Sequence, residues 1–320
     1  MNEISNKSCV VGAGHWGKNY LKTLSQLNIN FSVVEQDKKT RALLKDQYSN
    51  IKFYNNIDET FEQDYDSYFI ITPPHTHYDL ALKCLENNKN VLIEKPLTLI
   101  PKDAKQLYKV AKEKKKTLAV GHLLLFHPAV RLIKKYIQDG YIGEIKYIYS
   151  NRLNLGTVRT KEDVIWSLAP HDISVIQFLV DSFPNKIETI SQALVNRNIN
   201  DIATIFLDYA DKKIKSHIFV NWLNPIKDHS LTIIGNKRMI TLNGVSNELT
   251  VHHKFLNEKN VFLHSQDISV QKIDYEFDYP LTLQIKHFLN NQNNPNIKYI
   301  GGKEAIDVMN ILHDASSKLS

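Results

Sequence analysis

The feature that most constrains the fold is a short apolar strand followed at once by a glycine-rich turn and a helix. Ser8–Val11 is a candidate for a buried strand, and the run Gly12-Ala13-Gly14-His15-Trp16-Gly17 follows it directly. From Trp16 to Leu27 the apolar residues recur at helical spacing and share one stripe. This order predicts the first strand, turn and helix of a doubly wound α/β sheet, the context in which a G-x-G-x-x-G motif has meaning.

Strand and helix candidates alternate through the first third of the chain. Apolar strand candidates follow at residues 31–34, 68–71, 90–93 and 117–120. Helical segments near 40–48, 76–88 and 102–115 separate them. Because such strands pair in parallel through right-handed crossovers, we expect a doubly wound parallel sheet in a first domain over residues 1–122.

After residue 122 the pattern changes to consecutive strands. A helix opens at Pro128, and another is predicted over 170–181. Strand candidates fill most of the rest, at 144–155, 187–196, 201–210, 213–222, 230–234, 237–242, 247–253 and 267–275. We therefore expect an α+β domain over residues 123–320 with an open, mostly antiparallel sheet. A last helix at 303–318 could pack on either domain.

The composition is that of a soluble globular chain and excludes several classes of protein. The 320 residues are 42% hydrophobic, and a net charge of +6 is too small to indicate nucleic acid without a concentrated basic patch. We find neither an apolar stretch of about 18 residues nor a signal-peptide core, so we expect a cytoplasmic protein with no membrane partner. Two cysteines and the lack of His-Glu-x-x-His spacing argue against a disulfide scaffold and a metal site.

The glycine motif has the chemistry of a phosphate cradle. Gly12 permits a tight turn, Gly14 has no Cβ to block a pyrophosphate, and Gly17 lets the helix pack closely on the strand. The first N–H groups of the helix, around His15 and Trp16, then face the anion. The turn therefore predicts binding of a dinucleotide.

An acidic residue ends the second predicted strand. Glu35 lies 18 residues after Gly17, close to the spacing of about 20 at which a carboxylate binds the ribose hydroxyls. A carboxylate there accepts from the 2′- and 3′-hydroxyls and repels a 2′-phosphate, which favours NAD over NADP, although basic residues follow nearby. Asp37 could cap the next helix or make a second ribose contact.

A loop with two prolines follows the 68–71 strand, at the edge of the sheet where ligands bind. Pro73 and Pro74 would hold it as a wall against a flat ring. Thr72 and His77 flank the prolines, although His77 could equally be a first-turn residue of the next helix. We expect these four residues to contact the cofactor.

A second loop, Glu94-Lys95-Pro96, follows the 90–93 strand at the same edge. The ammonium of Lys95, held between an apolar strand and a rigid proline, would be a strong donor to a reacting oxygen. An ordinary surface lysine is the alternative for a lone Lys. We assign Glu94 and Lys95 to the cofactor site.

Taken in order, these motifs resemble the Gfo/Idh/MocA oxidoreductase family. The likeness extends over nearly the whole chain through the stretches 121–130, 152–156 and 166–172, and it is weak after about residue 181. These later stretches resemble the branch of UDP-N-acetylhexosamine and hexosaminuronate 3-dehydrogenases. The resemblance implies a Rossmann domain followed by a mixed α/β domain, NAD(P) as cofactor, and homodimers or homotetramers formed through the second sheet.

The resemblance also implies a chemical role for two residues. Lys95 matches the family lysine that contacts the substrate hydroxyl and the nicotinamide, and His171 matches the histidine that takes the hydroxyl proton. Many relatives have aspartates four residues before and three residues after that histidine, where this chain has Ser167 and Ser174. Whether Asp172 or a water replaces the missing partner stays open.

The surroundings of His171 give an independent argument for the same role. Pro170 would occupy the first turn of the predicted 170–181 helix and place His171 near its positive end. That field disfavours imidazolium and keeps the ring neutral, as a base requires. A histidine that caps or packs at a helix start is the alternative.

Residues around the predicted 144–155 strand are candidates for substrate binding. Period-two alternation puts Arg152 and Asn154 on one side of the strand, unless that side simply faces solvent. Arg152, or Arg159 in the following loop, could hold a carboxylate or phosphate through two hydrogen bonds. Further candidates are His122, Lys95, Trp166, His171 and Asp172.

The sequence thus predicts an NAD-dependent enzyme that transfers a hydride between nicotinamide and a sugar carbinol. The favoured substrate is C3 of a nucleotide sugar in surface-glycan synthesis. The alternatives are a free-sugar or inositol dehydrogenase, a keto-sugar reductase, or a non-catalytic NAD-binding regulatory subunit, against which Lys95 and His171 argue.

Overall fold

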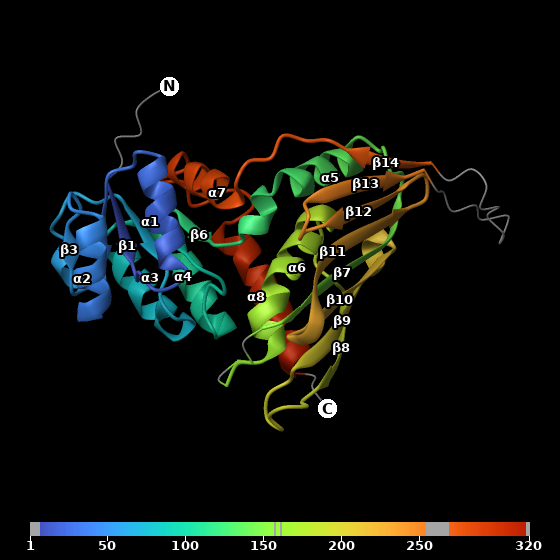
Figure 1. The fold of residues 1–320 in the computed structure, drawn as a ribbon, viewed down its shortest axis with the longest axis horizontal. Helices are drawn as coiled ribbons and strands as arrows, with labels where there is room; N and C mark the ends of the chain where they lie inside the picture. Colours follow the sequence, from blue (N-terminus) through green and yellow to red (C-terminus); the bar gives the residue numbers. More distant parts are fainter. Residues whose placement is uncertain (1–6, 157, 161, 254–268, 318–320) are drawn as a thin grey trace. The chain divides into compact units, whose positions relative to one another are not determined.

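The protein, seen as a computed structural model, is described over residues 7–156, 158–160, 162–253 and 269–317. Within these residues the chain divides into two compact units, each built around its own sheet (Figure 1). The first unit extends to Phe126 and includes Asp278–Met309. The second comprises His127–Phe277 and the chain from Asn310 onwards.

The first unit contains a parallel sheet. Its strands are β1 Ser8–Val11, β2 Phe31–Val34, β3 Phe53–Tyr54, β4 Ser67–Ile70, β5 Asn90–Ile93 and β6 Leu118–Val120. They lie in the order β3-β2-β1-β4-β5-β6, and every pairing between them is parallel. All but β3 are buried at each position, as strands are when helices cover both faces of a parallel sheet. The predicted doubly wound sheet is confirmed.

The first unit also contains α-helices, several of which pack on this sheet. They are α1 Gly17–Gln26, α2 Lys38–Gln47, α3 His77–Glu86, α4 Pro101–Glu113 and α7 Pro280–Leu289. Helix α1 packs on β1 and contacts α7, whereas α3 packs on β4 and β5 and against α4. Asp37 accepts a hydrogen bond from the Thr40 N–H at 2.7 Å and so caps α2.

A segment from late in the chain completes the first unit. The Val120 N–H donates to the Ile300 carbonyl at 2.8 Å, and Ala119 forms a bridge with Gly301. In α7, the Gln284 side chain donates to the Val120 carbonyl at 3.2 Å. These bonds extend the edge of the sheet at β6, and no local pattern in the sequence indicates them.

The second unit contains a mixed sheet that is mostly antiparallel. Its strands are β7 Ile145–Leu155, β8 Lys186–Gln192, β9 Ile202–Tyr209, β10 Ile214–Asn221, β11 Leu223–Gly235, β12 Met239–Asn243, β13 Glu248–His252 and β14 Val270–Ile273. The order is β14-β13-β12-β11-β7-β10-β9-β8, in which β7 and β10 pair in parallel and the other neighbours antiparallel. The expected mostly antiparallel sheet is confirmed.

Two helices lie along one face of this sheet (Figure 1). They are α5 Pro128–Gln138 and α6 Val164–Val180. Helix α6 contacts β7, β9 and β10 and packs against α5. On β7 the fully buried Ile148 and Ser150 share the parity that faces α6, while Tyr147 and Tyr149 have the opposite parity. A further helix, α8 Gly302–Ser317, spans the position at which the two units divide.

Helix α6 begins earlier than predicted. Asp163 caps it by accepting a hydrogen bond from the Trp166 N–H at 3.0 Å, so Pro170 lies inside the helix rather than in its first turn. His171 is therefore in the middle of the helix. The prediction that the field of a helix N-terminus keeps His171 neutral is wrong, because that field falls off within the first turn.

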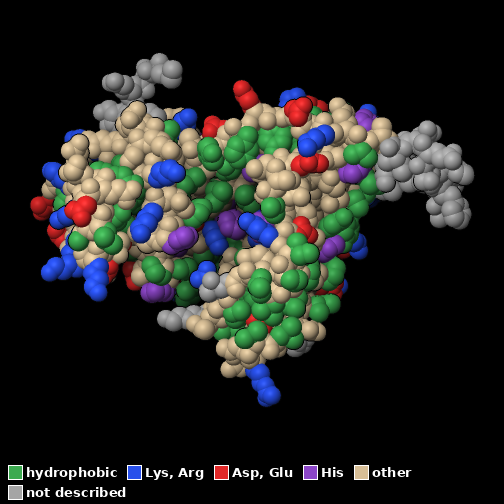
Figure 2. All heavy atoms as spheres, in the orientation of Figure 1, with side chains coloured by type: hydrophobic (Ala, Val, Ile, Leu, Met, Phe, Trp, Pro, Cys, Tyr) green, Lys and Arg blue, Asp and Glu red, His purple; other side chains and the backbone are tan. Residues whose placement is uncertain are grey.

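Charge is dispersed over the face drawn in Figure 2. Lys and Arg side chains lie among Asp and Glu side chains on this face and do not form one broad basic area. Among the described residues, no helix is long and apolar enough to cross a membrane, and no group of His, Cys, Asp and Glu has the arrangement of a metal site. Cys9 and Cys84 are both buried free thiols.

Candidate functional site

The glycine turn after β1 is tightly packed at two glycines and open at the third. Gly12 has a φ of +91°, and a Cβ there would lie 2.8 Å from the Ile71 carbonyl oxygen. A Cβ at Gly17 would lie 2.3 Å from the Gly12 carbonyl oxygen, whereas one at Gly14 would meet nothing within 4 Å among the described residues. The turn therefore leaves open space at Gly14, where a pyrophosphate can approach the backbone. His15 and Trp16 are exposed in the same turn.

Glu35 is held at the end of β2 by backbone donors. Its Oε2 accepts from the Ala13 N–H at 2.8 Å, and its Oε1 accepts from the Asp37 N–H at 2.9 Å. Each carboxylate oxygen can accept more than one hydrogen bond, so capacity remains for the hydroxyls of a ligand. The predicted ribose-binding carboxylate is thus fixed beside the glycine turn.

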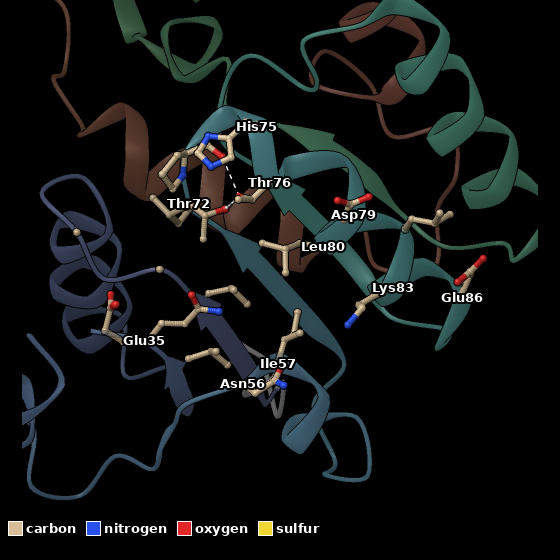
Figure 3. Close-up of a pocket in the computed structure, with 18 residues that line it drawn as sticks. Glu35, Asn56, Ile57, Thr72, His75, Thr76, Asp79, Leu80, Lys83 and Glu86 are labelled. Atoms are coloured by element: carbon tan, nitrogen blue, oxygen red, sulfur yellow. Dashed lines mark hydrogen bonds between the residues drawn. The ribbon is translucent and has the colours of Figure 1, made fainter. Parts of the chain in front are cut away.

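A pocket of about 960 Å³ opens between these two features, a volume in the range of small-molecule sites. Gly14 and Glu35 line it, and Ile57 and Leu80 project into it as apolar side chains (Figure 3). Lys83, from α3, also lines the pocket. Apolar walls beside a glycine turn and a fixed carboxylate fit the adenosine half of a dinucleotide.

The sequence analysis did not predict several of the residues that line this pocket. Asn56 and Ile57 come from the turn after β3. Thr76 is the N-cap of α3, and Leu80 and Lys83 follow it in the helix on the same side. The signal was present, because spacings of four and three residues place the side chains of a helix on one side. Thr76 also donates to the Thr72 hydroxyl at 2.7 Å, as drawn in Figure 3.

The proline loop after β4 is only partly a pocket wall. Thr72 and Pro73 line the pocket, and Pro74 begins a short turn, η2 Pro74–Thr76. His77 is fully buried, with Nδ1 2.8 Å from the Pro96 carbonyl oxygen and Nε2 2.8 Å from the Thr72 carbonyl oxygen. His77 thus ties the two predicted loops together.

The protonation of His77 is set by opposing effects. Burial lowers the pKa of His77, and its contacts with the two carbonyl oxygens raise it, with burial the stronger effect. Because a carbonyl oxygen only accepts, both contacts are hydrogen bonds at once only when both ring nitrogens carry hydrogen. A neutral ring donates to one of the two loops.

Glu94 and Lys95 follow β5. Glu94 is buried, and its carboxylate accepts hydrogen bonds from Trp16, Tyr20 and the Lys95 N–H. Lys95 is joined to Pro96 by a cis peptide bond.

His122 lies at the end of the neighbouring strand β6. It is 2% exposed, and neither ring nitrogen has a hydrogen-bond partner among the described residues. Burial, reinforced by the charge of Lys95, lowers the pKa of His122 to about 4. The first unit thus holds a neutral imidazole within the field of Lys95.

In the second unit, Arg152 and Asp172 are paired. Arg152 Nε lies 2.5 Å from Asp172 Oδ2, and Arg152 Nη2 lies 3.2 Å from Oδ1. The pair joins β7 to α6, and the two side chains are only 13% and 7% exposed. Both carboxylate oxygens of Asp172 therefore accept hydrogen bonds from Arg152.

The remaining substrate candidates of the second unit have different surroundings. His171 is half-buried in α6, and its carbonyl accepts from the Ser174 hydroxyl at 2.8 Å. Trp166 is half-buried in the first turn of α6, and Asn154 is half-buried on β7. Arg159 is exposed, and its Nε lies 3.5 Å from Glu162 Oε1. Their predicted role in substrate binding stays a prediction.

Three known proteins resemble the chain over different lengths. UDP-N-acetylglucosamine 3-dehydrogenase from Acidithiobacillus ferrooxidans is 23% identical over 252 residues, which covers 78% of each chain. Its solved structure superposes with a TM-score of 0.84 at 21% identity and covers 98% of this chain and 97% of that one. An oxidoreductase from Agrobacterium radiobacter, in complex with NAD+, L-tartaric acid and magnesium, gives a TM-score of 0.83 at 15% identity over 98% and 96% of the chains. Inositol 2-dehydrogenase from Rhizobium meliloti is 26% identical over 143 residues, 43% of each chain.

Two family models match consecutive parts of the chain. The model of the oxidoreductase family with an NAD-binding Rossmann fold matches residues 7–122. The model of the Gfo/Idh/MocA C-terminal domain matches residues 130–241. With both domains matched in order and most of its length covered, the chain belongs to the Gfo/Idh/MocA oxidoreductase family.

Proposed function

We propose that this protein is an NAD-dependent dehydrogenase that transfers a hydride between nicotinamide and a carbinol carbon of a nucleotide sugar, with C3 as the reacting carbon. One observation carries the proposal: the glycine turn, Glu35 and Lys95 all follow strands at the carboxyl edge of one parallel sheet. That edge is where open α/β sheets bind ligands.

The carboxylate of Glu35 supports NAD as the cofactor. Two backbone N–H groups hold it beside the pocket, so it is positioned to accept from ribose hydroxyls. A 2′-phosphate would bring negative charge against this carboxylate and would be repelled. NADP is therefore the disfavoured cofactor.

Lys95 and His171 are the proposed catalytic residues. Bound NAD would supply the redox chemistry by taking the carbinol hydrogen with its electron pair. His171 accepts the hydroxyl proton, and Lys95 donates a hydrogen bond to the same oxygen while negative charge grows on it. In the opposite direction His171 returns the proton. The role of His171 rests on its match to the family histidine.

Nucleotide sugars are the proposed substrate class. Similarity to UDP-N-acetylglucosamine 3-dehydrogenase over 78% of both chains supports this choice. Such a substrate presents phosphate and hydroxyl groups, which basic and amide side chains such as those of Arg159 and Asn154 can bind. We place the reaction in the cytoplasm, in the synthesis of surface glycans, because nucleotide sugars are activated glycan precursors.

The test offers the protein a panel of substrates and measures turnover of each one by the absorbance of NADH. UDP-N-acetylglucosamine, its uronate, free N-acetylglucosamine and myo-inositol are each offered with NAD, and saturation-transfer NMR measures which of them bind. Turnover with the UDP-sugars alone is the expected result. Turnover with inositol or the free sugar would instead favour a free-sugar dehydrogenase, and NAD binding without turnover of any alcohol or ketone would favour a regulatory subunit.

We also propose that two copies of the chain associate through the open face of the second sheet. On the face opposite α6, Tyr149 and His217 stack with ring centroids 5.3 Å apart, and Phe206 lies 5.9 Å from His217. Phe206 keeps 39% of its surface exposed. Exposed aromatic side chains in the middle of a sheet face are typical of a surface that association buries.

A further inference from the structure

Glu94 is a buried carboxylate that receives hydrogen bonds from three parts of the first unit. Its Oε1 accepts from Trp16 Nε1 at 2.7 Å and from the Tyr20 hydroxyl at 2.7 Å. Its Oε2 accepts from the Lys95 N–H at 3.1 Å. Trp16 belongs to the glycine turn, Tyr20 to α1, and Lys95 to the loop after β5, so one side chain connects all three.

The partners of Glu94 specify a carboxylate. The indole N–H of Trp16 and the backbone N–H of Lys95 can only donate, and they bind opposite oxygens of the group. A glutamine of the same size would turn its NH2 group toward one of them, whichever way its amide pointed. One donor would then lose its partner in a site that is only 8% exposed.

The neighbouring strand leaves room for this carboxylate. Gly121 follows β6, and a Cβ at that position would lie 2.8 Å from Glu94 Oε1 and 3.0 Å from Oε2. Any side chain at 121 would therefore displace the carboxylate from its donors. Glycine at this position and glutamate at 94 form a matched pair.

We propose that Glu94 is a positioning residue that links the dinucleotide-binding turn to Lys95, so that movement of the turn and movement of the lysine are coupled. The carboxylate is held by the turn through Trp16 and holds the backbone of Lys95 in return. A ligand that fixes the turn thereby also fixes the residue that bears the reacting ammonium. The inference rests on the proposed function for the role of Lys95, whereas the hydrogen-bonded link itself does not.

The link is tested first without turnover, by NMR of the indole N–H groups. The chain has three tryptophans, and the Trp16 resonance is identified by its loss in Trp16→Phe. A hydrogen bond to a carboxylate is expected to move this resonance downfield, and titration with NAD is expected to shift it further. In Glu94→Gln the resonance should move upfield. If the chemical shift of the Trp16 indole N–H changes neither in Glu94→Gln nor on titration with NAD, the proposal is overturned.

The consequence for Lys95 is tested by kinetics. Glu94→Gln is expected to lower kcat by about tenfold to a hundredfold, the cost of a small misplacement, while the Kd for NADH stays within about threefold. Gly121→Ala should reproduce both results, because it displaces the carboxylate without altering its chemistry. Glu304→Gln is the matched control, since Glu304 is a half-buried carboxyl beside another glycine, Gly301, and should leave both constants unchanged.

The outcomes separate this inference from the proposed function. If the wild type oxidises none of the sugars, the proposed function fails, and the NMR experiment still decides whether the link exists. If Glu94→Gln does not fold, Gly121→Ala and the wild-type titration decide. An unchanged kcat in Glu94→Gln, or a loss confined to NADH affinity, would overturn the coupling to Lys95.

Discussion

Arg152 and Asp172 form a two-point ion pair between β7 and α6, with both side chains almost fully buried. Removing one partner leaves the other charge unpaired in a site with little water. Asp172→Ala should therefore lower the free energy of unfolding by about 3–5 kcal/mol. Urea denaturation measures the change. The double variant Arg152→Met, Asp172→Leu should recover most of the loss. A loss below about 1 kcal/mol in Asp172→Ala would mean that the pair is solvated, as surface pairs are.

Glu35 should set the choice of dinucleotide. In Glu35→Gln the repulsion of a 2′-phosphate is removed and a charged acceptor for the ribose is lost, so the ratio of kcat/KM for NAD to that for NADP should fall by about tenfold to a hundredfold. Asp37→Asn is the control and should leave this ratio unchanged, because the Asp37 carboxylate accepts from the Thr40 N–H and caps α2. A wild type that prefers NADP would show that Glu35 has been misassigned.

Lys95 should matter for the chemical step and not for cofactor binding. Lys95→Met is expected to reduce kcat by about a hundredfold or more, since a charged donor to the reacting oxygen is lost. The Kd for NADH, measured by calorimetry, should change by less than about threefold. Lys7→Met provides the comparison: Lys7 lies outside the pocket lining and its Nζ pairs with Asp64 Oδ2 at 2.9 Å, so its loss should leave kcat intact. Equal turnover in wild type and Lys95→Met would remove this residue from the mechanism.

Acid should destabilise the protein through His122. Its pKa is about 4 in the folded protein and about 6.5 when unfolded, so the unfolded chain binds more protons between these values. The contribution to stability is complete above pH 6.5 and is lost as the pH falls toward 4, by up to about 3 kcal/mol. His122→Asn should flatten the pH dependence of the unfolding free energy in this window. The same change at His313, an exposed histidine, should leave the slope as it is.

Self-association should depend on the aromatic side chains of the open sheet face. Phe206→Asp places a charge among Tyr149 and His217, and light scattering after gel filtration should then report a monomer where the wild type gives a dimer or tetramer. Leu43→Asp makes the same kind of change at an exposed position on α2 and should have no effect. A monomeric wild type would refute the proposal directly.

The parts of the fold that could be predicted are those encoded locally. Buried parallel strands such as Ser8–Val11 appear as short apolar runs because both of their faces are covered. Gly12 is required by its φ of +91°, Gly17 is required by its contact with the Gly12 carbonyl oxygen in the same turn, and Glu35 follows at a fixed spacing. In the structure Gly12 and Glu35 line the same pocket.

The elements that were mispredicted had local signals that competed. Pro170 indicated a helix start because proline is favoured in a first turn, but Asp163, seven residues earlier, is the actual cap. Helix α7 was missed although Pro280 opens it and Ile285 and Phe288 are buried at helical spacing. The information lay in the capping residue Asp163 for α6 and in the first-turn proline Pro280 for α7.

Other features could not be predicted, because they join residues far apart in the chain. The pair Arg152–Asp172 and the bond from Val120 to Ile300 arise only when separate elements meet in space. Periodicity describes which side of an element is buried and is silent about the partner on the other side. Buried charge pairs, and segments from late in the chain that pair with a sheet edge, are therefore visible only in the three-dimensional structure.

The bond between Val120 and Ile300 also has a consequence for biosynthesis. A ribosome that has released the residues up to Phe126 still holds α7 and Gly301, so the nascent first unit has an open strand edge at β6. That edge is closed only after the residues up to Gly301 have emerged. Maturation of the nucleotide-binding half is thus delayed until these late residues have been made, and during that delay the open edge of the growing chain can pair with a wrong partner unless a chaperone covers it.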